Sequence, residues 1–117
     1  MTVLCAGLLS CSGSTDSTVE SFFHEIDGGD VPAALARFSP RVREKLTDGQ
    51  LAQAVTHWSQ DFKAHGGIKQ MSLSGAVVTL NQLSLYDVTL TFGDGTQRSL
   101  QTSVIRVGGA WYINSAL

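Results

Sequence analysis

Charged residues, cysteines and long apolar runs are all scarce in this chain of 117 residues. Charged side chains make up 15% of it, and 8 basic against 10 acidic residues give a net charge of -2. Nucleic-acid binding needs a basic face that contacts several phosphates, yet the densest group of Arg and Lys is RVREK at 41–45. No apolar run approaches the roughly 20 residues of a membrane-spanning helix. A nucleic-acid partner is therefore not expected, and the 43% of hydrophobic residues indicates one globular domain.

The few cysteines and histidines do not form a metal-binding pattern. Cys5 and Cys11 are the two cysteines, and both lie in the first eleven residues. The three histidines, His24, His57 and His65, are not spaced by three or four residues and do not form an HExxH motif. We predict no metal and no cofactor, with the histidines at the surface or at the edge of the core.

The amino terminus has the pattern of an export signal. Residues 3–9 form a short apolar run, which is followed by the small residue Ser10 and then by Cys11. Leu8-Leu9-Ser10-Cys11 resembles the bacterial lipobox, which implies cleavage before Cys11 and a lipid on its thiol. A signal begins with positive charge, whereas the first basic residue here is Arg37, so we expect the reading frame to extend upstream into Lys or Arg. The alternative is a frayed terminus with two incidental cysteines.

The resemblance to a lipobox implies a division of the chain and a location. Residues 1–10 would be the signal peptide, residues 11–16 the lipidated Cys11 with a flexible polar tether, and residues 17–117 the folded domain. More than one acyl chain gives stable membrane anchoring. The domain is then expected in the cell envelope, lipid-anchored and facing the periplasm. Ser12, where an inner-membrane retention signal has Asp, slightly favours the outer membrane.

Helical periodicity extends from about residue 17 to residue 67. Two capping boxes, one at residues 17–20 with Ser17 as the cap and one at residues 47–50, predict helices over residues 18–27 and from residue 48 to the Gly66-Gly67 stop. Asp30 and Pro32 predict a short helix between them. After Ser39-Pro40, the RVREKL stretch adds one or two amphipathic turns.

From residue 68 the apolar period changes to two, which predicts strands. Four are expected, over residues 68–80, 86–92, 97–107 and 110–115, with a bulge or bend at Gly75 in the first. Asp94-Gly95 and Gly108-Gly109 are hairpin turns. We therefore predict an α+β fold in which three N-terminal helices pack on one face of a bent four-stranded antiparallel sheet.

Two stretches resemble a known superfamily. FFHEIDGGDVPAALARFSP at 22–40 and RVGGAWYI at 106–113 are similar to the NTF2-like (cystatin-like) superfamily, and in particular to exported bacterial lipoproteins of the DUF4878 or lumazine-binding-like type. The resemblance implies a cone with a concave cavity between the sheet and the first and third helices. The residues expected near that cavity are Phe22, Phe23, Trp58, Tyr86, Val88, Leu90, Val104 and Trp111. These side chains either fill the cone as packing or line a small apolar pocket.

Two functions remain open at this point. The first is a non-catalytic, membrane-tethered binding domain that acts through an envelope protein partner or a small ligand, as an immunity or inhibitor lipoprotein does. The second is a small isomerase or hydrolase, which needs a proton donor and a carboxylate base in an apolar cavity. Tyr86 is a candidate donor, but Asp61 is only a marginal candidate for the base, and no nucleophile motif appears. We predict no catalytic residue, and the oligomeric state, a homodimer included, stays open.

Overall fold

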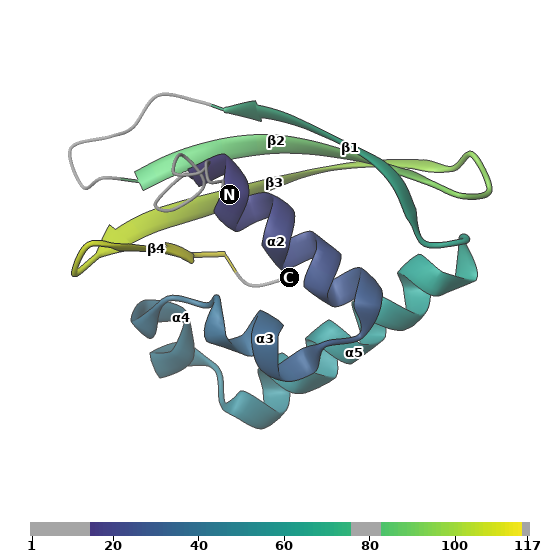
Figure 1. The fold of residues 1–117 in the computed structure, drawn as a ribbon. Helices are drawn as coiled ribbons and strands as arrows, with labels where there is room; N and C mark the ends of the chain where they lie inside the picture. The colour runs from purple at the N-terminus through teal and green to yellow at the C-terminus, as the bar shows by residue number, and fades with distance from the viewer. Residues whose placement is uncertain (1–14, 76–82, 116–117) are drawn as a thin grey trace, which may run out of the picture.

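The computed structural model describes residues 15–75 and 83–115 (Figure 1). Within these two ranges four helices are followed by four strands, with the bounds α2 (Thr15–Gly28), α3 (Val31–Ala36), α4 (Pro40–Lys45), α5 (Asp48–Ala64), β1 (Ile68–Gly75), β2 (Leu83–Phe92), β3 (Gln97–Val107) and β4 (Ala110–Ile113). The predicted α+β class is confirmed, and the turns expected in RVREKL form the short helix α4. The signal peptide and the lipid site predicted at Cys11 lie outside the described residues.

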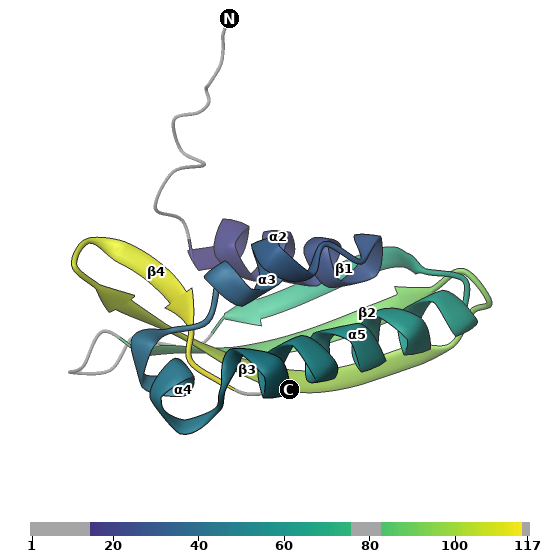
Figure 2. The ribbon, with the colours of Figure 1, turned by 90° about the horizontal axis from the view of Figure 1, so that it is seen from below.

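The strands form one antiparallel sheet in the order β1-β2-β3-β4. The sheet curls over the helices, and α2 crosses its concave side, where it contacts β1, β4, α3 and α5 (Figures 1 and 2). β1 ends at Gly75, so the bend expected there involves residues outside the described ones. Within the described part of β1, the register shifts near the start of the strand, between Ile68 and Gln70. No helix in the described ranges is long and apolar enough to cross a membrane.

The first capping box of the sequence analysis is wrong. Helix α2 begins at Thr15 rather than after Ser17, so Thr15 and Asp16, which were expected in the tether, belong to the helix. A tertiary contact accounts for the difference, because the Tyr86 hydroxyl of β2 donates a hydrogen bond of 2.5 Å to Oδ1 of Asp16. A bond from the sheet thus fixes a turn that the local sequence pattern assigns to the tether.

The caps at Thr47 and Asp30 are as the sequence predicts, whereas the cap at Ser39 was not predicted. Thr47 accepts a hydrogen bond from the Gln50 amide at 3.1 Å, and the Gln50 side chain accepts one from the Thr47 amide at 2.9 Å. Asp30 caps α3 by accepting from the amide of Ala33. Ser39 caps α4, with Pro40 in the first turn, where a missing amide leaves no hydrogen bond unmade. These bonds satisfy backbone donors that a helix start otherwise leaves free.

The segment between α3 and α4 also closes the edge of β4. The amide of Ile113 donates to the carbonyl oxygen of Arg37 at 2.7 Å, and the carbonyl oxygen of Ile113 accepts from the amide of Ser39 at 2.8 Å. Phe38 forms a parallel bridge with Ile113 between those bonds. The edge strand is therefore fixed to the helical layer at the point where α4 begins.

The core lies between the concave side of the sheet and the helices. Phe22 on α2 packs edge to face against both Phe23 and Phe38, with ring centroids 5.3 Å apart in each pair. The apolar side chains that α2 turns toward the sheet, Val19, Phe22, Phe23 and Ile26, are fully buried. The largest buried side chains come from every layer and are Val19, Phe22, Phe23, Ile26, Phe38, Leu51, Val55, Phe62, Val88, Leu90, Phe92 and Ile113.

Candidate functional site

The side chains predicted to lie near a cone cavity are in the middle of the core. Phe22, Phe23, Val88, Leu90 and Val104 are fully buried and Tyr86 is 5% exposed, so in this structure they pack against one another. That they also line a ligand pocket stays a prediction. The two tryptophans, Trp58 and Trp111, are only partly buried and pack against the outside of the core.

The donor and the base considered for an isomerase are not brought together. The Tyr86 hydroxyl bonds to Asp16, whereas the Asp61 carboxylate bonds to the guanidinium of Arg98. Arg98 lies opposite Leu90 in the sheet, four positions along β2 from Tyr86, which corresponds to roughly 13 Å of strand. Asp61 therefore pairs with a cation at one end of the sheet, while Tyr86 bonds to α2 at the other.

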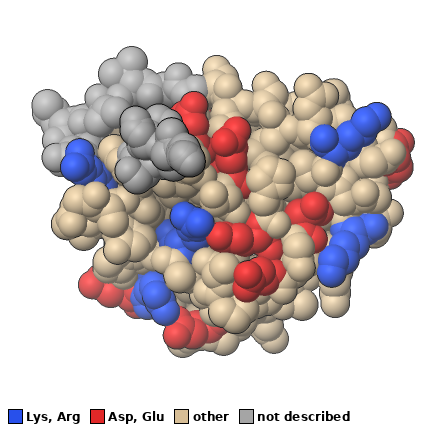
Figure 3. Space-filling model, in the orientation of Figure 1, with Lys and Arg blue, Asp and Glu red and all other residues tan. Residues whose placement is uncertain are grey.

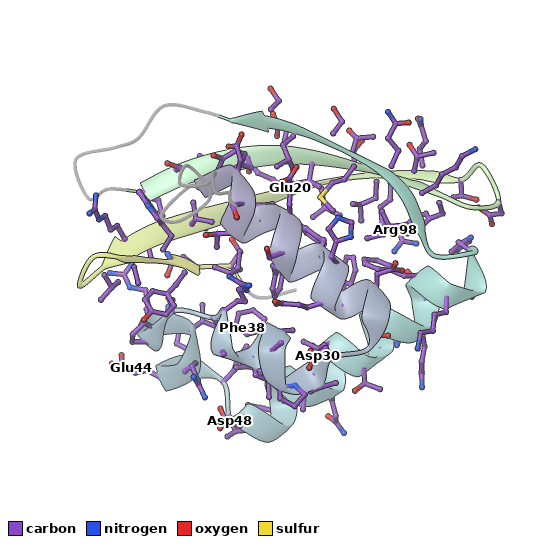
Figure 4. The ribbon with its side chains drawn as sticks, in the orientation of Figure 1. Glu20, Asp30, Phe38, Glu44, Asp48 and Arg98 are labelled. Carbon is purple, nitrogen blue, oxygen red and sulfur yellow. The ribbon has the colours of Figure 1, made fainter. Side chains whose placement is uncertain are left out.

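Four charged or titratable side chains meet where α5 ends against the β2–β3 hairpin. These residues, which we call the hairpin cluster, are Asp61, His65, Asp94 and Arg98. His65 lies between the two carboxylates, with Nδ1 2.9 Å from Oδ2 of Asp94 and Nε2 3.8 Å from Oδ1 of Asp61. Arg98 lies between the sheet and the end of α5 (Figure 4), where it donates to Asp61. Every member has a partner of opposite or complementary charge inside the cluster.

The pKa values of both carboxyl groups in this cluster are low. The backbone amide of Thr96 and the ring of His65 hold the pKa of Asp94 at about 2. The hydrogen bond from Arg98 lowers the pKa of Asp61. Hydrogen bonds to the charged form of a carboxyl group explain both directions. At neutral pH the two carboxylates are thus ionised and engaged.

Aromatic rings and a close backbone contact complete this end of the molecule. The Arg98 guanidinium lies 5.6 Å from the ring centroids of both Trp58 and Phe92, which suits cation–π attraction. The amides of Gly93 and Asp94 donate to the carbonyl oxygens of Gly67 and His65, at 2.9 Å each. The hairpin cluster therefore holds α5 to the sheet. In the described part of the chain no group of three His, Cys, Asp or Glu side chains is arranged to hold a metal ion.

A different arrangement occurs at the opposite end, where α4 meets the end of β4. This end has a surface hollow of about 340 Å³, which we call the α4 hollow. It is lined by Arg41, Val42, Lys45, Leu46 and Asn114. Among the described residues, the side chains of Arg41 and Lys45 make no hydrogen bond or ion pair. Two cations thus border a partly apolar hollow without a counter-charge from the described residues.

Charge elsewhere on the surface is mostly mixed or paired. On the face shown in Figure 3, Lys and Arg side chains are spread out with Asp and Glu among them. A second hollow, beside Trp111 and Tyr112, contains the Glu25–Arg37 ion pair with its 2.9 Å contact. The hydrogen bond from Arg37 to Glu25 raises the pKa of that arginine. The polar groups of this second hollow are therefore already matched, unlike those of the α4 hollow.

The α4 hollow is absent from the sequence predictions, in which RVREK is only the densest basic stretch and Asn114 has no assigned role. The signal was present in part, because Arg41 and Lys45 are four residues apart, as are Val42 and Leu46, so a helix places each pair on one side. Asn114 lies beside α4 because β4 pairs with the segment before α4, and no local sequence pattern predicts that pairing.

Two solved structures have the same fold. One is a Campylobacter jejuni protein whose name describes it provisionally as an NTF2-like transpeptidase. It superimposes with a TM-score of 0.73 at 13% sequence identity, and the match covers 87% of this chain and 99% of that one. A SEC-C motif-containing protein from Rhodopseudomonas palustris superimposes with a TM-score of 0.61 at 12% identity, over 88% of this chain and 77% of that one. No family model and no curated protein matches this chain by sequence. The chain thus has an NTF2-like fold, and similarity of fold alone does not assign an activity to it.

Proposed function

We propose that this chain is a non-catalytic binding domain that a lipid on Cys11 tethers to a membrane of the bacterial cell envelope, with the domain facing the periplasm. It would act there through a protein partner or a small ligand, as exported lipoproteins of the DUF4878 or lumazine-binding-like type are expected to do. The observation that carries the proposal is the position of Leu8-Leu9-Ser10-Cys11, which ends four residues before helix α2 begins at Thr15.

The short connection has a consequence for placement. Four residue steps separate Cys11 from Thr15, and a fully extended chain of that length spans at most about 14 Å. A lipid on Cys11 would therefore keep the first turn of α2 close to the membrane surface. A partner or ligand would be met within a short distance of the lipid headgroups.

Binding is favoured over catalysis by how the candidate catalytic groups are used. Tyr86 bonds to Asp16 and Asp61 bonds to Arg98, so each group has a partner that is not the other. The interior side chains are apolar and closely packed, whereas an isomerase needs a donor and a base facing one cavity. These contacts support a structural role for Tyr86 and Asp61.

The lipid anchor is tested by metabolic labelling. The gene is expressed in a bacterium with its natural upstream sequence, and the cells are fed an alkyne-bearing fatty acid. Wild-type protein and the matched control Cys5→Ala should carry the label and fractionate with membranes, whereas Cys11→Ala should carry none. Label retained in Cys11→Ala, or absent from the wild type, would contradict the anchor.

The proposed partner is tested in the same cells. Wild-type protein is crosslinked in intact cells and compared with Cys11→Ala, which keeps the folded domain and loses the tether. We expect an envelope protein to be recovered in constant ratio with the wild type and in a much smaller amount with Cys11→Ala. Equal recovery with both forms would mean that the tether plays no part in partner choice.

A further inference from the structure

The α4 hollow is built from two distant parts of the chain. Arg41, Val42 and Lys45 come from α4, and Asn114 follows the last strand. Ser39 joins the two parts, because its hydroxyl accepts from the amide of Val42 at 3.2 Å and donates to Oδ1 of Asn114 at 2.8 Å. This bond uses the amide oxygen of Asn114 and leaves its nitrogen as a hydrogen-bond donor.

The charge at the rim of the hollow is positive and unmatched within the described part of the chain. Arg41 and Lys45 are four residues apart on one helix, so they repel each other. The acidic residues nearby do not compensate, because Asp48 pairs with Arg43 at 3.3 Å, and Glu44 points outward from the molecule (Figure 4). Among the residues that the structure describes, no carboxylate lines the hollow. A bound anion would relieve the repulsion and accept from three donors.

The floor of the hollow is apolar. Val42 is 6% exposed and belongs to the core, and Leu46 is partly buried against it. A volume of about 340 Å³ lies within the range of pockets that hold small organic ligands, roughly 300–1,000 Å³. Cations at the rim and aliphatic side chains below fit a molecule with an anionic head and a short apolar tail.

We propose that the α4 hollow binds a small carboxylate that carries a short aliphatic chain. The carboxylate is held by the guanidinium of Arg41, the ammonium of Lys45 and the amide nitrogen of Asn114, and the chain lies on Val42 and Leu46. Arginine suits this head group because its planar donors match the two oxygens of a carboxylate. The assignment rests on the proposed function only in that the domain binds rather than catalyses, and it does not depend on the lipid anchor.

The test uses the full chain with Cys11→Ala, so a failure of the anchor does not affect it. Hexanoate is titrated into isotopically labelled protein, and backbone and side-chain amide resonances are followed by NMR. We expect saturable shifts at Leu46 and at the side-chain amide of Asn114. Acetate, which keeps the head group and loses most of the chain, should bind at least about tenfold more weakly, because it buries fewer methylene groups.

Variants separate the site from general surface charge. Arg41→Gln and Lys45→Gln should each weaken hexanoate binding by about tenfold, because each removes a charge-assisted contact. Arg43→Gln is the matched control, since Arg43 lies on the same helix but pairs with Asp48. It should leave the affinity nearly unchanged. Dispersed spectra of each variant confirm that it is folded.

Three results would overturn the proposal. One is equal weakening by Arg43→Gln, which would indicate only a diffuse field. The second is binding of inorganic phosphate as tight as that of hexanoate, which would make the site a plain anion site without use of its apolar floor. The third is an absence of saturable shifts with hexanoate in the millimolar range. The lipid-labelling result leaves each of these outcomes unchanged, so the two proposals fail separately.

Discussion

The charged side chains are paired at one end of the domain and unpaired, among the described residues, at the other. In the hairpin cluster, Asp61, His65, Asp94 and Arg98 meet one another, and each carboxylate is engaged. At the α4 hollow, Arg41 and Lys45 have no such partner among the described residues. Charges that are matched internally hold elements together, whereas unmatched charges beside an apolar surface are available to a ligand. The comparison therefore separates a structural end from a candidate binding end within one small fold.

The two ends are also fastened by different means. The hairpin end combines aromatic packing, cation–π contacts and backbone hydrogen bonds between the loop after α5 and the β2–β3 turn. The α4 end depends on a helix of six residues, the Ser39 cap and the bridge from Phe38 to Ile113. We expect substitutions at the hairpin end to change stability most and substitutions at the α4 end to change binding most.

The largest expected effect is at Phe62. Its ring is fully buried, 5.6 Å from the ring of Trp58 and 5.2 Å from that of Phe92. Phe62→Ala should lower the free energy of unfolding by about 3–5 kcal/mol, because it leaves a cavity as well as losing apolar burial. Urea unfolding measures the change. The comparison at the other end is Leu46→Ala, which should lose clearly less since Leu46 is only partly buried. Equal losses would remove the distinction between the ends.

A smaller loss is expected at Gly93, where two backbones approach. A Cβ atom there would lie 2.7 Å from the carbonyl oxygen of Gly66, and a backbone oxygen cannot swing aside as a flexible side chain does. Gly93→Ala should lower the free energy of unfolding by about 1–3 kcal/mol through overpacking. Gly28→Ala is the control, because a Cβ atom at Gly28 meets nothing within 4 Å. A loss at Gly28 as large as that at Gly93 would show that the close approach is not the cause.

A weaker effect is expected from pH at the same end. The folded pKa of Asp94 is about 2 against an ordinary value of 3.8, and the pKa of Asp61 is lowered in the same direction. Both groups therefore stabilise the fold above the ordinary pKa of an aspartate, and for Asp94 this stabilisation is lost as pH falls from about 4 toward about 2. The contribution of Asp61 is also lost as pH falls below its ordinary pKa. Asp94→Asn should lie below the wild type in melting temperature at pH 6, with the gap narrowing by pH 3. A gap that is constant with pH would rule out this linkage.

Local patterns in the sequence predicted much of the fold. The caps at Asp30 and Thr47, the Asp94-Gly95 turn and the alternation of β2 all depend on residues a few positions apart, and all are confirmed. The cap at Ser17 is wrong because a distant hydroxyl, that of Tyr86, holds an extra turn of α2. Local preference gave way there to a contact between residues 70 positions apart.

The two ends were harder to predict because both depend on register. Asp61 and Arg98 are 37 positions apart, and they meet only because α5 lies against the part of β3 that pairs with Leu90. Arg41 and Lys45 were visible as a basic stretch, but their hollow needs Asn114 from beyond the last strand. A sequence pattern reports which side chains share a helix face and not what the tertiary fold places opposite that face.

The smallest expected effect on stability is at the α4 hollow, and it sharpens the comparison most. Arg41 and Lys45 repel each other at a helix spacing of four and make no compensating contact within the described residues. Replacing both with Gln should therefore change the free energy of unfolding by no more than about 0.5 kcal/mol, with any change toward greater stability. Urea unfolding at low and high salt measures it, since screening should remove a repulsive term. A loss of 2 kcal/mol or so would show that these cations serve the fold. A double variant that is as stable as the wild type but does not bind hexanoate would mean that folding does not require the two charges, and that their effect is on ligand binding.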